Sequence, residues 1–158
     1  LDGLTDACRL AMRPLVAIGG LDLETGRQAI EVGAAAVAMI GALVDRSEEG
    51  IAKRARQLAA VLQQAAAPLP FDEVQRRVPV VSTELLLELA RWSDDVGMHI
   101  ELGLPARFRP RLRDGVPQYR SCDVLDLLYS LDKRPGESWD AWRERTGGSE
   151  GPLVQIRR

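Results

Sequence analysis

The chain has 158 residues, of which 46% are hydrophobic and 28% are charged, and its formal net charge is −2. This composition is typical of a globular protein, and the small net charge gives no reason to expect nucleic acid or an acidic partner for the chain as a whole. The apolar run at residues 34–44 is shorter than the roughly 20 residues of a membrane-spanning helix, so no membrane association is expected.

The first elements predicted along the chain are a helix and a buried strand. Leu1, Leu4, Cys8 and Met12 recur at helical spacing with no capping residue ahead of them. This pattern indicates that the chain enters the helix partway, at a truncated N-terminus. Residues 14–18 then form a short apolar run ended by two glycines, which is typical of a buried strand in a parallel sheet.

A second helix, a second strand and a long third helix follow. We predict a helix at 23–32, with Asp22 as its N-cap and Gly33 just beyond its C-terminus. Residues 36–40 read as another buried strand, and Ser47 caps a helix that continues to about residue 64. Strand, helix and strand in this order predict one βαβ unit.

Small residues and two prolines at 66–70 predict a linker. It divides the chain into a first segment, residues 1–65, and an unassigned second segment, residues 71–158. In the second segment we expect helices at 82–95, at 121–131 and around Trp139, short strands at 98–102 and 153–156, and an extended proline-bearing stretch at 105–120.

The two strand ends carry the most informative residues. Gly19 and Gly20 follow the first strand, and Ile40 and Gly41 end the second. Neighbouring parallel strands end at the same edge, and their exposed N–H groups can hold a phosphate dianion because glycine lets a ligand approach the backbone. We therefore predict a phosphate site at these four residues. Tight turns and close packing are the alternative explanations for the glycines.

The same residues resemble a known family. Residues 13–21, RPLVAIGGL, are similar to the strand-seven signature P-V-V-A-I-G-G-I of thiamine-phosphate synthases, and residues 31–43, EVGAAAVAMIGAL, resemble their A-G-A-D-G-V-A-V-I-S-A-I stretch. The resemblance covers about residues 1–65. It implies an α/β fold, namely the C-terminal portion of a TIM (β/α)8 barrel (its last two strands and their helices), followed by a small α-rich or α+β appendage. A complete barrel has about 250 residues.

The resemblance also implies a reaction. The family is a transferase that joins hydroxymethylpyrimidine diphosphate to a thiazole phosphate and releases pyrophosphate. It holds the thiazole phosphate at positions that match Gly20, Ile40 and Gly41 here. Gly41 replaces the usual serine, which keeps the main-chain N–H and removes the hydroxyl.

The catalytic and Mg²⁺-binding residues of the family lie on earlier strands that no segment here matches. We therefore expect Mg²⁺ only in the intact parent enzyme, no catalytic or metal residue in this chain, and small-molecule phosphates as partners. We also expect a cytoplasmic location. The chain alone should bind phosphate weakly, catalyse nothing, and be unstable or prone to aggregation because strand edges lack partners.

Two alternatives stay open. One is another phosphate-binding TIM-barrel enzyme, such as an isomerase, an aldolase or a thiazole-aromatising protein. The other is a non-enzymatic interaction module carried by residues 71–158. Arginines beside an aromatic residue can grip single-stranded nucleic acid, but Asp114 and the mild acidity favour a solvated loop, so nucleic acid is not an expected partner. The stretch in question holds Arg107, Phe108, Arg109, Arg111 and Arg113.

The remaining candidates favour structural roles. Asp22 and Asp45 lie near the predicted phosphate site, but we interpret them as a helix cap and a solvated loop residue. Trp139 and Trp142, three residues apart, are expected to pack the second segment. The other sets rest on residue type alone: a metal pair of His99 and Glu101, a nucleophile set of Ser121, Cys122 and His99, and the thiols Cys8 and Cys122, which we expect to be reduced.

Overall fold

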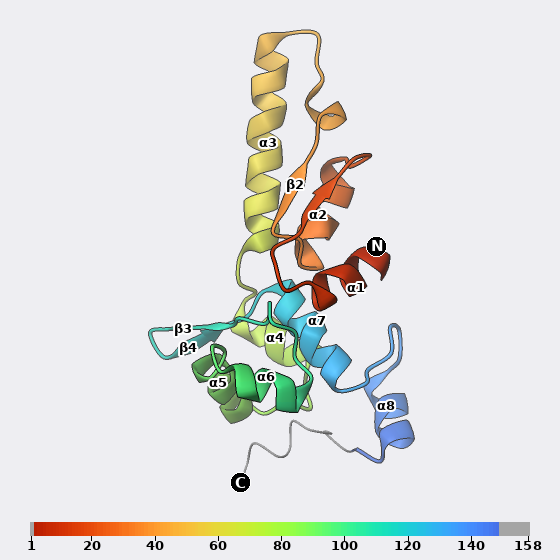
Figure 1. Ribbon diagram of the computed structural model, residues 1–158, viewed down its shortest axis with the longest axis vertical. Helices are drawn as coiled ribbons and strands as arrows, with labels where there is room; N and C mark the ends of the chain where they lie inside the picture. Colours follow the sequence, from red (N-terminus) through yellow and green to blue (C-terminus); the bar gives the residue numbers. More distant parts are fainter. Residues whose placement is uncertain (1, 149–158) are drawn as a thin grey trace. The chain divides into compact units, whose positions relative to one another are not determined.

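The computed structural model describes residues 2–148 (Figure 1). Two compact units divide the chain: one extends to Pro68 and includes Arg120–Cys122, and the other holds Leu69–Tyr119 and the residues from Asp123 onward. Within the described residues there are eight α-helices and four short strands, and the chain is 54% helical. The strand expected at 153–156 lies outside the described residues.

The prediction of an α/β fold built on part of a TIM barrel is wrong. Among residues 2–148 the strands form two separate two-stranded sheets, and no barrel is closed. The apolar runs at 14–18 and 36–40 give strands of only three residues, which pair with each other and with no further strand of the described chain. Helices supply most of the remaining structure because the second segment buries its apolar residues at helical spacing.

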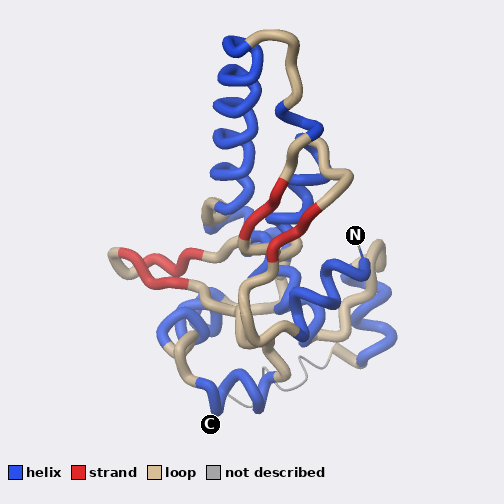
Figure 2. Tube along the Cα trace, turned by 45° about the horizontal axis from the view of Figure 1, so that its top comes forward, coloured by secondary structure: helices blue, strands red, loops and turns tan. Residues whose placement is uncertain are grey.

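The first unit does contain the predicted order of strand, helix and strand. β1 and β2 are parallel, with Val16 opposite Ala36 and Ile18 opposite Ala38 (Figure 2). The N-caps are also as predicted, since Ser47 accepts a hydrogen bond from the Gly50 amide. The elements are α1 (Asp2–Leu10), β1 (Val16–Ile18), α2 (Leu23–Glu31), β2 (Ala36–Ala38), the 3-10 helix η1 (Gly41–Leu43) and α3 (Glu48–Ala66).

Among the described residues of the first unit, only one face of this small sheet is covered. Ala17 and Val37 pack against a core of Cys8, Ala29 and Ala34. Side chains alternate along a strand, so Val16 and Ile18 lie on the opposite face, where they are 52% and 76% exposed. The core of the first unit is therefore small, and apolar strand residues face outward.

We expect the full chain to self-associate through this uncovered sheet face, because exposed apolar strands beside unpaired edges are aggregation sites. The double substitution Val16→Lys/Ile18→Lys should shift the protein from oligomers toward monomer in size-exclusion chromatography with light scattering. Leu23→Lys, at an exposed leucine of α2 in the same unit, is the control and should change little. A monomeric wild-type chain that melts cooperatively would contradict this expectation.

The second unit is helical, with one β-hairpin. The predicted strand at 98–102 is wrong: α6 covers these residues, with His99 and Leu102 buried at helical spacing and Ile100 exposed. The stretch predicted as extended holds the hairpin. The elements are α4 (Phe71–Arg77), α5 (Thr83–Arg91), α6 (Val96–Leu102), β3 (Arg111–Arg113), β4 (Val116–Gln118), α7 (Ser121–Ser130, which belongs to this unit from Asp123 onward) and α8 (Trp139–Thr146).

A larger apolar core stabilises this unit. It contains Phe108, Tyr119 and Trp142, each almost completely buried, among aliphatic side chains of the helices. The Tyr119 hydroxyl donates a hydrogen bond to the Leu86 carbonyl at 2.6 Å. Burial first, and then the charge of Asp123, raise the pKa of Tyr119 well above its ordinary value, so the phenol stays protonated and keeps this bond.

Candidate functional site

The four residues predicted to bind phosphate follow β1 and β2 at one edge of the first unit's sheet. Because the two strands are parallel and in register, Ile18 and Ala38 end at the same edge. Gly19 and Gly20 follow the first strand directly, and Ile40 and Gly41 follow two and three residues after Ala38. All four residues are exposed, and Ile40 is 85% exposed.

The backbone requires glycine at only two of the three glycine positions at this edge. Gly19 and Gly20 have φ angles of +88° and +62°, which side-chain-bearing residues rarely adopt. Gly41 has no such angle, and a Cβ added there would meet nothing within 4 Å. The backbone therefore explains the first pair, whereas neither backbone angle nor space prevents a serine at position 41.

The loop after β2 turns at once into the short helix η1. The Leu43 amide donates to the Ile40 carbonyl at 3.0 Å, and the Val44 amide donates to the Gly41 carbonyl at 3.3 Å. The first amides of a helix have no carbonyl one turn earlier within that helix. Gly41 and Ala42 are the first residues of η1, so their N–H groups have no acceptor within this helix. These two N–H groups are therefore the donors that an anion at this loop can use.

Asp22 is the N-cap of α2. Its carboxylate accepts from the Thr25 amide at 2.8 Å and from the Thr25 hydroxyl at 2.7 Å, while the Asp22 amide donates to that hydroxyl. The bond from the Thr25 amide is the main reason that the pKa of Asp22 lies below its ordinary value. The cap prediction is confirmed, and the carboxylate occupies the N-terminus of α2.

Asp45 is held in place more firmly than a solvated loop residue. Its carboxylate pairs with Arg54 at 3.1 Å and accepts from the Ser47 amide at 3.2 Å. The Ser47 amide, and then the charge of Arg54, lower the pKa of Asp45. Gly50 makes this arrangement possible, because a Cβ at that position would lie 2.2 Å from an Asp45 oxygen.

These carboxylates do not fit a Mg²⁺ site. The Oδ1 atom of Asp22 accepts both bonds from Thr25, and the two oxygens of Asp45 contact the Ser47 amide and Arg54. In the part of the chain that the structure describes, no three His, Cys, Asp or Glu side chains gather closely enough to hold a metal ion.

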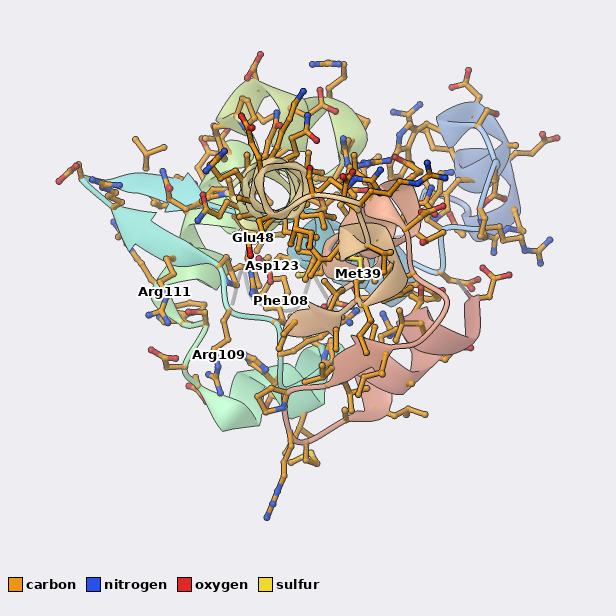
Figure 3. The ribbon with its side chains drawn as sticks, turned by 90° about the horizontal axis from the view of Figure 1, so that it is seen from above. Met39, Glu48, Phe108, Arg109, Arg111 and Asp123 are labelled. Atoms are coloured by element: carbon orange, nitrogen blue, oxygen red, sulfur yellow. The ribbon has the colours of Figure 1, made fainter. Side chains whose placement is uncertain are left out.

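The arginine run of the second unit divides into two pairs with different environments. Arg107 makes two hydrogen bonds to the buried Asp126, at 2.8 and 3.2 Å. Arg109 donates to the Ser93 carbonyl and to Asp94. Arg111 and Arg113 lie on the exposed strand β3 instead. Arg109 and Arg111 can be followed in Figure 3 along the stretch that leads into the hairpin.

His99 has a structural role in the second unit. It is buried, and its ring nitrogens lie 2.7 Å from the Ser93 carbonyl and 3.2 Å from the Pro105 carbonyl. Its ring also meets Phe108 edge-on. Glu101 is exposed. Both ring nitrogens of His99 therefore face backbone carbonyl oxygens. His99 and Glu101 do not form the metal-binding pair that the sequence suggested.

The tryptophans and cysteines also have structural environments. Trp142 is buried and donates its indole N–H to the Leu131 carbonyl at 2.8 Å, and Trp139 packs edge-on against it. The prediction that this pair packs the second segment is confirmed. Cys8 and Cys122 are both buried and free of disulfides.

Sequence reasoning missed the buried carboxylates and the hairpin. Asp123 and Asp126 are fully buried in α7, where Asp123 accepts from the Arg109 amide. No local pattern signals such partners. The hairpin had a signal, since Asp114-Gly115 is a preferred dipeptide for a two-residue turn.

Comparison with protein-family models, with curated proteins and with solved structures finds no match for this chain. In the described part of the chain, no helix combines the length and the apolar composition that crossing a bilayer requires.

Proposed function

We propose that the first unit binds the phosphate group of a small-molecule substrate through the backbone of the loops after β1 and β2. The observation that carries this proposal is the in-register parallel pairing of β1 and β2, which brings Gly19, Gly20, Ile40 and Gly41 to one edge of the sheet. Left-handed glycines and the start of a short helix present N–H groups that suit an anion.

The ligand we propose is the thiazole phosphate of the thiamine-phosphate synthase reaction. The similarity of residues 13–21 and 31–43 to that family supports this choice, and the exposure of the four residues leaves room for a dianion. In this proposal the chain contributes the phosphate-binding loops to a transferase, and the acceptance of pyrimidine diphosphate and the chemical step depend on residues that this chain does not match. We expect no turnover from the chain alone.

The proposal is tested by NMR on the full ¹⁵N-labelled chain, titrated with thiazole phosphate, inorganic phosphate and glycerol phosphate. We expect the amide signals of Gly19, Gly20 and Gly41 to shift, with weak binding. Tighter binding of thiazole phosphate than of glycerol phosphate would support the synthase reaction. Equal binding would support only a general phosphate site, and unshifted glycine amides would contradict the proposal.

Two substitutions sharpen this test. Gly41→Ser restores the hydroxyl of the resembled family without steric conflict and should tighten binding about 2- to 12-fold, the effect of one hydrogen bond. Gly20→Val should weaken binding because it forces a left-handed loop to rearrange. Gly136→Val is the matched control, since Gly136 has a φ of +74° in a loop of the other unit. Equal loss in both valine variants would indicate a general folding defect.

A further inference from the structure

The loop after β2 has a side chain that enters the first unit. Side chains alternate along a strand, so Met39, two residues after the core-packed Val37, continues on the covered side of the sheet, whereas Ala38 and Ile40 are exposed. Met39 is partly buried and is labelled in Figure 3. It stands two residues before Gly41, whose N–H group is one of the two donors of the proposed phosphate site. The placement of the Met39 side chain therefore bears on the placement of that donor.

The end of the Met39 side chain lies against α2, at a glycine. A Cβ added to Gly26 would lie 3.0 Å from the Met39 Sδ atom and 3.2 Å from its Cε atom. Gly26 is buried within α2, and the Leu62 side chain of α3 reaches the same place, with its Cδ2 atom 3.8 Å from that Cβ position. The absence of a side chain at Gly26 thus provides the space in which the thioether of Met39 lies.

The contact with Met39 explains a glycine that the backbone does not require. Glycine weakens the interior of a helix because it loses more conformational freedom on folding than other residues, and Gly26 does not have a positive φ angle. Gly3, a glycine of α1, has nothing within 4 Å of an added Cβ. The flexible, unbranched methionine side chain suits an irregular gap of this kind. Close approach of the loop therefore distinguishes Gly26 from Gly3.

The two loops of the phosphate site are attached to the unit by different means. The loop after β1 leads directly into the N-cap of α2 at Asp22. In the loop after β2, the hydrogen bonds of η1 join residues 40–44 only to one another. Arg54 attaches the far end of this loop by donating to the Val44 carbonyl at 2.8 Å. The Met39 side chain is placed to attach the other end, which is nearest to the N–H donors.

We propose that Met39 is a positioning residue for the phosphate site: it anchors the loop after β2 to α2 and thereby holds the N–H groups of Gly41 and Ala42 in place. This inference rests on the proposed function of the first unit, and it adds to that site a residue that acts through the loop backbone. A short, exposed helix such as η1 has few contacts of its own to keep it ordered. The order of the donors is therefore expected to depend on the contact between Met39 and Gly26.

NMR on the full ¹⁵N-labelled chain without ligand tests the anchor itself. We expect a nuclear Overhauser effect between the Met39 ε-methyl group and the Gly26 Hα atoms. In Met39→Ala, the order parameters of the Gly41 and Ala42 amides should fall toward about 0.6, the value that marks flexible backbone. Met39→Leu keeps an apolar side chain and should restore most of the order. Met12→Ala is the control, at a methionine of the same unit that is 85% exposed, and should leave both order parameters unchanged.

Titration of the same variants with inorganic phosphate measures the effect on binding. Met39→Ala should weaken binding about tenfold, because a loop that holds its donors in place for about one-tenth of the time binds with about one-tenth of the affinity. Gly26→Ala favours the helix but displaces the Met39 thioether, so it should weaken binding without lowering the melting temperature. In the Met39→Ala background, Gly26→Ala should weaken binding no further. Gly3→Ala is the matched control, since a Cβ there meets nothing.

Unchanged order parameters at Gly41 and Ala42 in Met39→Ala would overturn the inference, and so would equal effects of Met39→Ala and Met12→Ala. Thermal melts establish that each variant remains folded. A failure of the proposed function gives a different result: the wild-type chain does not bind phosphate, yet its loop loses order in Met39→Ala. Equal phosphate affinity of the wild-type chain and of Met39→Ala would leave the phosphate site intact and would contradict the positioning role.

Discussion

Asp126→Ala is expected to lower the free energy of unfolding of the second unit by about 3–5 kcal/mol. Asp126 is fully buried, and Arg107, 13% exposed in its side chain, forms two hydrogen bonds to its carboxylate. Removing the carboxylate leaves a charged guanidinium with little access to water and without this partner, and that desolvation is the cost. Urea denaturation followed by tryptophan fluorescence measures the effect, because all three tryptophans lie in the second unit.

Two controls separate this cost from a general loss of charge. Asp94→Ala also breaks an ion pair with an arginine, but the Asp94 side chain is 84% exposed, so a loss of only about 0.2–1 kcal/mol is expected. The double variant Arg107→Leu/Asp126→Leu replaces both charges with apolar groups and should recover much of the lost stability. A loss below 1 kcal/mol for Asp126→Ala would show that the buried pair contributes little.

Trp142→Ala should have a similar effect, about 3–5 kcal/mol, because it leaves a large cavity in the core. Trp142 is 1% exposed, contacts Trp139, and satisfies the Leu131 carbonyl. Thermal and urea unfolding of the variant, monitored by circular dichroism, measures the loss.

A conservative substitution at position 142 separates the contribution of the indole hydrogen bond from that of core packing. Trp142→Phe keeps most of the ring and removes the indole donor, so about 1–3 kcal/mol is expected from the unsatisfied Leu131 carbonyl. Trp92→Ala, at an exposed tryptophan of the same unit, is the control and should change stability by much less. An equal loss in Trp142→Ala and Trp92→Ala would contradict the packing role assigned to Trp142.

The local elements of the first unit could be predicted from the sequence, but its architecture could not. Apolar runs, caps and glycines act over a few residues, and they gave β1, α2, β2 and α3 in the right order. Whether strands join a larger sheet depends on pairing between distant segments, which local patterns do not encode. The extrapolation from two strand ends to part of a barrel was therefore wrong, although the parallel pairing of β1 with β2 was anticipated.

The second unit shows the same limit at the level of single side chains. The residues at 98–102 are compatible both with the alternation of a strand and with the spacing of a helix. The structure forms a helix there, in which His99 and Leu102, three residues apart, are both buried. Arg107 meets a carboxylate 19 residues later in the chain, so nothing near it in sequence distinguished it from Arg111. The edge position of the four candidate phosphate-binding residues, by contrast, followed directly from the strand order.

The division of the arginine run has a consequence for tolerance to substitution. Lysine carries the charge of arginine but cannot form the two parallel hydrogen bonds of a guanidinium. At position 107 a lysine would therefore destabilise the fold, while at positions 111 and 113 it would keep the exposed positive charge. Arginines close together in the sequence therefore differ in which substitutions they tolerate. Arg107 needs the geometry of the guanidinium, whereas Arg111 and Arg113 need only a positive charge to preserve the surface.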